Sequence, residues 1–209
     1  MRKTMTILEM LFIGFTVGLT GAIAPGPMLF ATIESSLRMG WTAGPRVIFG
    51  HAILEVVVCI LIILGLTSVM NYGVTRVISL IGGISLCVFG GLILKDRKRS
   101  VPDTGKSSKM LGPVIAGLVA SASNPYFWIW WLSAGSGLII EGLKTGLIAV
   151  GFFIAGHWFA DAGWFILISA SASRGKQLLS PHAYSLILTL CGLFLIIFGL
   201  WFVILLYWS

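Results

Sequence analysis

Long apolar stretches, separated by short polar segments, make up most of the 209-residue chain. An α-helix rises about 1.5 Å per residue and needs about 20 residues to cross a hydrocarbon core of about 30 Å. Each of the stretches is long enough to do so. The pattern therefore predicts an all-α integral membrane protein with six transmembrane helices, over residues 10–37, 46–70, 75–95, 110–140, 144–173 and 181–208.

The composition supports this prediction and excludes several classes of protein. Hydrophobic residues account for 57% of the chain and charged residues for only 10%, with a mean hydropathy of +1.01. Because a soluble domain carries about 25% charged residues, a soluble enzyme, a disordered protein and a nucleic-acid-binding protein are excluded. The chain has no G-x-S-x-G, H-E-x-x-H or C-x-x-C motif, so we expect neither an enzymatic activity nor a cofactor.

The basic residues predict the orientation of the chain, because lysine and arginine concentrate in the cytoplasmic loops of membrane proteins. Ten lie in the loops after the first, third and fifth predicted helices: Arg38, Arg46, Lys95, Arg97, Lys98, Arg99, Lys106, Lys109, Arg174 and Lys176. Four lie on the other side: Arg2, Lys3, Arg76 and Lys144. We therefore expect these three loops, including the linker 96–109, in the cytoplasm. Both termini would then lie outside a plasma or inner cell membrane.

The two halves of the chain resemble each other. Both contain the pattern G-H-x-x-x-acid at an offset of 106 residues, as Gly50-His51 with Glu55 and as Gly156-His157 with Asp161. Two glycines seven residues apart follow in each half, at 83 and 90 and at 192 and 199. Since each half has three predicted helices, an odd number, the halves enter the membrane from opposite sides. The sequence predicts two inverted three-helix repeats, residues 1–95 and 110–209, a construction typical of secondary transporters.

Prolines interrupt the first and fourth predicted helices. Pro25, Gly26 and Pro27 lie in the middle of the first apolar stretch, and Asn124-Pro125 lies in the fourth. A proline removes a backbone donor and clashes one turn back, and in lipid such a break survives only where protein buries it or where it lines a cavity. We expect two broken helices near the midplane whose free backbone groups bind a solute. Simple packing kinks are the alternative interpretation.

Two neighbouring residues extend this predicted solute site. Glu34 lies seven residues after Pro27 and either lines the solute path or pairs with Arg38 at i,i+4. Tyr126 opens an aromatic run that ends at Trp131. Aromatic rings beside a break can stack on a cationic amine, whereas elsewhere they pack or contact lipid.

Four ionisable residues inside the spans form two repeated pairs. His51 and Glu55, like His157 and Asp161, are four residues apart and share one helix face. Imidazole titrates near neutral pH, so the leading prediction is a proton-coupling site without metal; binding of a substrate amine is a second role. Inert hydrogen bonds between helices are an alternative. A divalent cation site is another, if both pairs meet at the pseudo-two-fold axis.

These features together resemble the LysE/RhtB-type exporter family over essentially the whole chain. The resemblance is carried by Ala24-Pro25-Gly26-Pro27, by the glycines at 40, 44 and 50, and by Ser123-Asn124-Pro125. It implies export of amino acids or similar small solutes, driven by protons or by the membrane potential. Two positions differ from the family pattern: His51 stands where an acid is often found, and Tyr126 stands where Asn-Pro is often followed by lysine. The resemblance therefore implies the class of transporter and not the solute.

The sequence thus predicts a secondary transporter that exports a small amino-acid-like solute by rocking one repeat against the other. The predicted partners are this solute, protons and the lipid bilayer. Gly14 and Gly18, four residues apart, fit either close helix contact within the chain or a homodimer interface. A cation transporter or channel that uses the same buried carboxylates is the alternative function.

Overall fold

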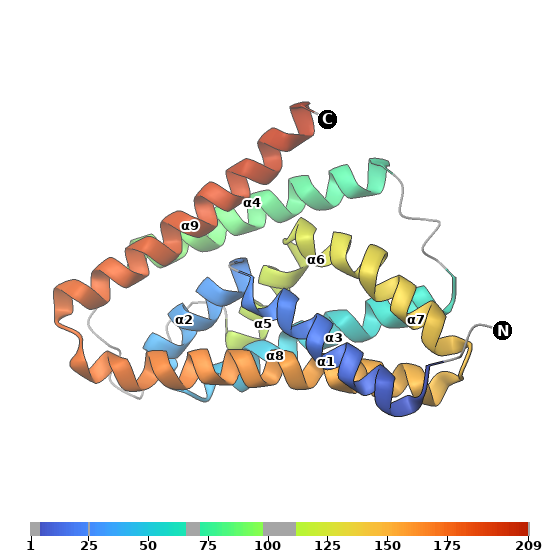
Figure 1. Cartoon of the computed structure of the whole chain (residues 1–209). Coiled ribbons are helices and arrows are strands. Elements are labelled where there is room, and N and C mark those ends of the chain that lie inside the picture. Colours follow the sequence, from blue (N-terminus) through green and yellow to red (C-terminus); the bar gives the residue numbers. More distant parts are fainter. Residues whose placement is uncertain (1–4, 25, 66–71, 98–111, 209) are drawn as a thin grey trace.

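The computed structural model describes residues 5–24, 26–65, 72–97 and 112–208, and all regular elements in this part of the chain are helical (Figure 1). The first half contains α1 (Ile7–Ile23), α2 (Pro27–Met39), α3 (Ala43–Ile63) and α4 (Tyr72–Asp96). The second half contains α5 (Pro113–Ala122), α6 (Pro125–Trp130), the π-helical turn η2 (Trp131–Gly135), α7 (Ser136–Leu143), α8 (Leu147–Gly175), the 3-10 helix η3 (Lys176–Leu178) and α9 (Pro181–Trp208).

Apolar helices of spanning length confirm that the protein is an all-α membrane protein. Three described helices qualify by length and composition: Ala43–Ile63, Leu147–Leu178 and Pro181–Trp201. The bent pair α1 and α2 is a fourth candidate. The described apolar helices of the two remaining predicted spans, Gly83–Lys95 and Pro113–Ala122, are shorter. Six spans therefore remain a prediction, and residues 66–70 and most of the linker, 98–109, lie outside the described residues.

The first predicted interruption is present, and Pro27 and Gly26 explain how the helix restarts. The axes of α1 and α2 differ by 74°. Gly26 is the N-cap of α2 in an extended conformation, and Pro27 is the first helical residue. A proline is tolerated there because the first amide of a helix has no intrahelical acceptor in any case. Pro25 lies outside the described residues.

The second predicted interruption is present at Asn124-Pro125. Helix α5 ends at Ala122, and α6 begins at Pro125 with Asn124 as its N-cap. The Asn124 side chain accepts a hydrogen bond from the backbone N–H of Tyr126 at 3.1 Å, so the amide satisfies one of the donors that the break exposes. Beyond α6 the chain passes through η2 before it returns to α-helix in α7.

Close contacts between helices run from one half of the chain to the other. Helices α4 and α9 lie antiparallel and side by side, and α1 and α8 lie parallel and side by side (Figure 1). Glycines allow the first contact: a Cβ built on Gly83 would lie 2.5 Å from the Gly199 carbonyl oxygen, and one on Gly90 would lie 2.5 Å from that of Gly192. The predicted glycine patterns of the two halves therefore meet each other across α4 and α9.

The same kind of contact occurs twice more, in a related arrangement. Gly14 on α1 lies against the Phe153 carbonyl of α8, and Gly156 on α8 lies against Leu11 of α1. Gly117 on α5 lies against the Val47 carbonyl of α3, and Gly50 on α3 lies against Val114 of α5. The α3–α5 interface therefore repeats the α1–α8 interface: α5 of the second half takes the place of α1, and α3 of the first half takes the place of α8. Gly14 and Gly18 thus pack within the chain, the first of the two predicted alternatives.

The apolar core has two parts. One joins α2, α4 and α9 through residues such as Ala31, Leu86 and Leu188, and the other joins α3, η2 and α8 through residues such as Val58, Trp131 and Phe153. Many other large apolar side chains point outward, among them Phe49, Ile148 and Phe159. An apolar exterior is expected where the surrounding solvent is lipid.

Replacement of Gly90 by alanine should destabilise the protein. The added methyl group would overlap the backbone of α9, at a cost of about 1–3 kcal/mol, of which about 1 kcal/mol is offset by helix propensity. Gly91→Ala is the matched control, since a Cβ there meets nothing within 4 Å. Thermal unfolding of the purified variants in detergent should give a lower midpoint for G90A than for G91A. Equal midpoints would contradict the close approach of α4 and α9.

Candidate functional site

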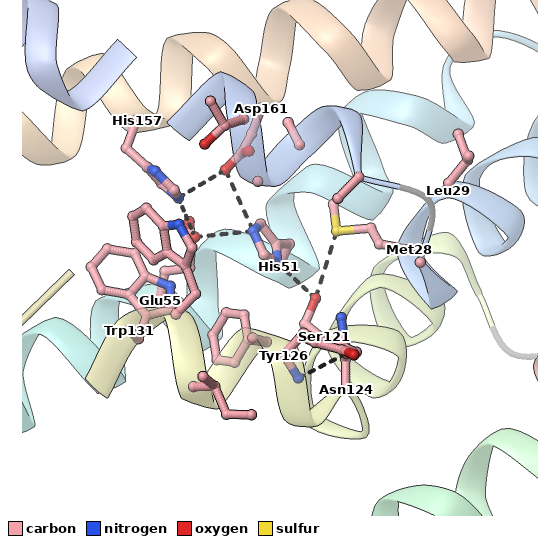
Figure 2. A pocket seen from close by; sticks show the side chains of 18 of the residues that line it. Met28, Leu29, His51, Glu55, Ser121, Asn124, Tyr126, Trp131, His157 and Asp161 are labelled. Carbon is pink, nitrogen blue, oxygen red and sulfur yellow. Dashed lines mark hydrogen bonds and ion pairs between the residues drawn. The ribbon is translucent and has the colours of Figure 1, made fainter. Parts of the chain in front are cut away.

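The four ionisable residues singled out in the sequence meet at one point between α3 and α8 (Figure 2). His51 and Glu55 come from α3, and His157 and Asp161 come from α8. Their exposed fractions are between 0% and 8%. One nitrogen or oxygen atom from each residue lies within 4.8 Å of those from the other three. Imidazole nitrogens and carboxylate oxygens bind both protons and metal ions, so the cluster could hold either protons or a cation.

Each imidazole in the cluster contacts both carboxylates. His51 Nε2 lies 3.0 Å from Glu55 Oε1 and 3.4 Å from Asp161 Oδ2. His157 Nε2 lies 2.8 Å from Glu55 Oε1 and 3.3 Å from Asp161 Oδ2. The shortest of the four contacts joins the two halves of the chain. The sequence predicted two separate pairs, and the structure combines them into one four-membered cluster.

Two residues that the sequence analysis did not identify support the cluster. Ser121 on α5 lies 2.6 Å from His51 Nδ1, and the Trp158 indole N–H donates to Glu55 Oε2 at 2.9 Å. The Ser121 hydroxyl also donates to the Gly117 carbonyl at 2.8 Å. No pattern marks Ser121 in the sequence, whereas Trp158 directly follows His157 in the repeated motif. Its place within that motif is the one signal that could have identified it.

A cavity of about 580 Å³ adjoins the cluster. It is lined from the first half by Thr20, Gly21, Ala22, Ala24, Gly26, Met28, Leu29, His51 and Glu55, and from the second half by Ser121, Asn124, Tyr126, Phe127, Ile129, Trp130, Trp131, Ser133, His157, Asp161, Phe165 and Phe198. Both helix breaks therefore contribute to its wall. No lysine or arginine is among these lining residues, so the groups among them that titrate near or below neutral pH are the two acids and the two histidines.

The two breaks lie next to each other in the wall of this cavity. Asn124 Oδ1 caps α6, and the position of a Cβ on Gly26 would lie 3.7 Å from Asn124 Nδ2. Gly26 and Asn124 both line the cavity, so the first backbone N–H groups of α2 and the Asn124 NH₂ group lie near the same space. Such donors suit a carboxylate group.

The remaining predicted site residues divide between the cavity wall and other positions. Tyr126 lines the cavity and is exposed. Pro27 is buried at the start of α2 and is not among the residues that line this cavity, and Pro125 is the first residue of α6. Glu34 is also absent from this lining; it is buried and forms an ion pair with Arg38, the second of its two predicted roles.

Part of the aromatic run lies against the cluster. The rings of Trp130 and Trp131 have their centroids 4.7 Å and 5.1 Å from that of His157. Both residues line the cavity, as do Tyr126 and Phe127. Trp128 instead donates its indole N–H to the Ala122 carbonyl at 2.9 Å. The run therefore has both predicted roles, cavity wall and packing.

A cavity between interrupted helices, with buried ionisable groups in its wall, is typical of secondary transporters. A model of the LysE type translocator family matches residues 19–206, and the chain belongs to this family. Membership confirms the resemblance seen in the sequence and implies membrane transport of amino-acid-like solutes rather than enzymatic catalysis. A comparison with curated proteins and one with solved structures gave no match.

Replacement of Ser121 by alanine should destabilise the protein by about 1–3 kcal/mol, because it leaves a buried His51 nitrogen without a partner. Ser85→Ala is the control: the Ser85 hydroxyl donates only to Ile81 of its own helix among the described hydrogen bonds. Thermal unfolding in detergent should give a clearly lower midpoint for S121A than for S85A. A midpoint of S121A equal to that of the unmodified protein would show that Ser121 does not support His51.

Proposed function

We propose that the protein exports a small amino-acid-like solute by alternating access, with the solute bound in the cavity beside the cluster. The observation that carries this proposal is the position of the cavity, whose wall includes Gly26 at one helix break and Asn124 and Tyr126 at the other. Hydrogen-bond donors at the breaks suit the solute carboxylate. The acids of the cluster and the aromatic rings suit an amine.

The architecture that we propose for this cycle is a pair of inverted three-helix repeats, residues 1–95 and 110–209. The related α1–α8 and α3–α5 interfaces support it, because the contacts of Gly14 and Gly156 in the first have counterparts at Gly117 and Gly50 in the second, with the halves exchanged. The antiparallel contact of α4 and α9 supports it as well, since glycines of the two helices lie directly against each other. Repeats of opposite topology are a common basis of alternating access.

Within the cavity, we propose that Gly26, Asn124 and Tyr126 contact the solute. The prolines at 25, 27 and 125 would act indirectly, by keeping the helices interrupted so that backbone groups stay free for it. Glu34 is not assigned a role in solute binding, because its ion pair with Arg38 already accounts for it.

For the energy source, we propose protons or the membrane potential. His51, Glu55, His157 and Asp161 are the groups that would hold the coupling protons. They line the solute cavity, so a change in the number of bound protons alters the electric field that the solute meets. Coupling of this kind requires that proton and solute sites lie close together, as they do in this arrangement.

The distribution of basic residues supports an orientation with both termini outside the cell membrane. Ten of the fourteen lysines and arginines lie in the three loops assigned to the cytoplasm, which agrees with the general preference of cytoplasmic loops for these residues. Solute would then enter from the side where α2 and α8 end.

Efflux from proteoliposomes tests the proposal. Vesicles loaded with single labelled amino acids should release at least one of them faster than protein-free vesicles do, when a pH gradient or a membrane potential is imposed. If none is released faster under either condition, the exporter assignment is wrong. A current that rises linearly with voltage and does not saturate in a planar bilayer would instead support the alternative, a cation channel.

Asn124→Asp tests the solute site. This change keeps the oxygen that caps α6 but replaces the NH₂ group with a second carboxylate oxygen, which repels a solute carboxylate. We expect the KM for efflux to rise by roughly 10- to 100-fold, the loss expected for one hydrogen bond to a charged group. Gln177→Glu makes the same chemical change at an exposed position and should leave KM unchanged. Equal effects of the two substitutions would remove Asn124 from the solute site.

A further inference from the structure

The four residues of the cluster place two nitrogen and two oxygen atoms around one point. The pairwise distances between the histidine Nε2 atoms and the acidic oxygens are 2.8, 3.0, 3.3 and 3.4 Å. Each nitrogen faces both oxygens, and each oxygen faces both nitrogens. Such mutual facing is the arrangement of four ligands around a common centre, and it differs from two independent histidine–carboxylate pairs.

Hydrogen bonds alone do not satisfy this arrangement. An Nε2 atom carries at most one hydrogen, so the four contacts can contain at most two N–H···O bonds. Asp161 Oδ2 is buried and has no hydrogen-bond partner among the described residues, although both imidazole nitrogens lie 3.3–3.4 Å away. A buried carboxylate oxygen without a donor costs about 1–3 kcal/mol or more. Asp161 Oδ2 is therefore an acceptor without a donor, and it is directed at the point that the four residues share.

Four of the six distances that a tetrahedral metal ion would set between its ligands, those between nitrogen and oxygen, are close to the expected values. Zinc binds imidazole nitrogen and carboxylate oxygen at about 2.0–2.2 Å, and tetrahedral ligands at these lengths lie about 3.3–3.6 Å from one another. Two of the four nitrogen–oxygen distances are already 3.3 and 3.4 Å. The two contacts of Glu55, at 2.8 and 3.0 Å, need to lengthen by only a few tenths of an ångström.

Two surrounding residues prepare the ligands for such an ion. When the Ser121 hydroxyl donates to the Gly117 carbonyl, its oxygen accepts from His51 Nδ1–H, which leaves a free lone pair on His51 Nε2. Trp158 donates to Glu55 Oε2, which leaves Oε1 directed at the centre. Hydrogen bonds that fix the second atom of a ligand are typical of metal sites in proteins.

The charges also balance. Two carboxylates and two neutral imidazoles carry a charge of −2, so one divalent cation makes the buried cluster neutral. A neutral assembly avoids the large cost of an uncompensated charge in a low-dielectric interior. The mixed nitrogen and oxygen ligands favour zinc and its first-row neighbours over magnesium or calcium, which prefer oxygen ligands alone.

From these observations we propose that His51, Glu55, His157 and Asp161 bind one divalent transition-metal ion of the zinc type. The ion joins α3 of the first half to α8 of the second. This site is additional to solute export and does not depend on which solute the protein carries. A bound metal ion and coupling protons would compete for the same lone pairs.

Metal binding to the purified protein tests the proposal directly. The untagged protein in detergent is titrated with Zn²⁺ in competition with a chromogenic chelator, and thermal unfolding is followed with and without Zn²⁺. We expect one ion per chain and a higher unfolding midpoint with Zn²⁺, because a ligand that binds only the folded state stabilises it. Binding by the unmodified protein of less than one ion per chain, even at excess Zn²⁺, overturns the proposal.

Matched variants locate the bound ion. His157→Gln and Asp161→Asn should each weaken Zn²⁺ binding by roughly tenfold or more. Even the replacement of residues that only hydrogen-bond to metal ligands lowers metal affinity by about 10- to 100-fold. His182→Gln and Glu141→Gln alter a histidine and an acid outside the cluster and should bind as the unmodified protein does. If the cluster variants and the control variants bind Zn²⁺ equally well, the ion lies elsewhere and the proposal is wrong.

X-ray absorption at the zinc edge keeps the proposal testable if the cluster variants do not fold. The unmodified protein should show four nitrogen or oxygen ligands at about 2.0–2.2 Å with the scattering pattern of imidazole, and no sulfur at about 2.3 Å. Cys59 is buried in the part of the core that joins α3, η2 and α8, and its thiol is the alternative zinc ligand that this measurement excludes. A sulfur ligand in the spectrum would overturn the four-residue assignment.

Solute efflux measured on the same preparation separates this proposal from the exporter assignment. Release of solute without stoichiometric Zn²⁺ binding overturns the metal site and leaves export standing. Binding at the cluster without release of any solute supports the metal site and contradicts export of the solutes tested.

Discussion

Two carboxylates and two imidazoles lie deep between helices of a protein whose surrounding solvent is lipid. Removing one such group from water is costly unless partners meet its charge and its hydrogen-bonding atoms. Here each group has partners both on its own helix and across the molecule, because α3 supplies one imidazole and one carboxylate and α8 supplies the others. The contact of His157 with Glu55 at 2.8 Å is the shortest in the cluster, and it requires α3 and α8 to be held in register.

Small residues provide that register. Gly50 and Gly156, which directly precede the two histidines, lie against the backbones of α5 and α1. Gly18 makes room for the second histidine itself, since a Cβ there would lie 2.6 Å from His157 Nδ1. The repeated glycine–histidine pattern therefore combines close helix packing with a buried ionisable side chain at neighbouring positions. The glycine brings a neighbouring helix close, and the next residue turns toward the interior on a backbone that this contact fixes.

The sequence predicted the features that depend on local rules. Apolar stretches predicted the helices, Pro27 and Pro125 predicted where they restart, and the spacing of His51 and Glu55 placed both on one face. It could not predict the bonds between His157 and Glu55, because i,i+4 spacing says nothing about which other helix lies opposite. Ser121 was missed for the same reason, since its partner is 70 residues away. For Glu34, the sequence was equally compatible with a place in the solute path and with an ion pair to Arg38, and the structure shows the ion pair.

The glycine contacts of α1–α8, α3–α5 and α4–α9 all run between the halves of the chain, and this has a consequence for motion. Sliding one whole half past the other would open α1–α8, α3–α5 and α4–α9 at once. In the alternating-access cycle that we propose, keeping these three interfaces closed divides the molecule differently, into one body that contains α1 with α8 and another that contains α3 with α5. Movement between the two bodies would then open the contact of Gly44 with Ser169 on α8. The boundary between those bodies passes through the histidine–carboxylate cluster, so the hinge of the transport cycle and its ionisable centre would be the same few atoms.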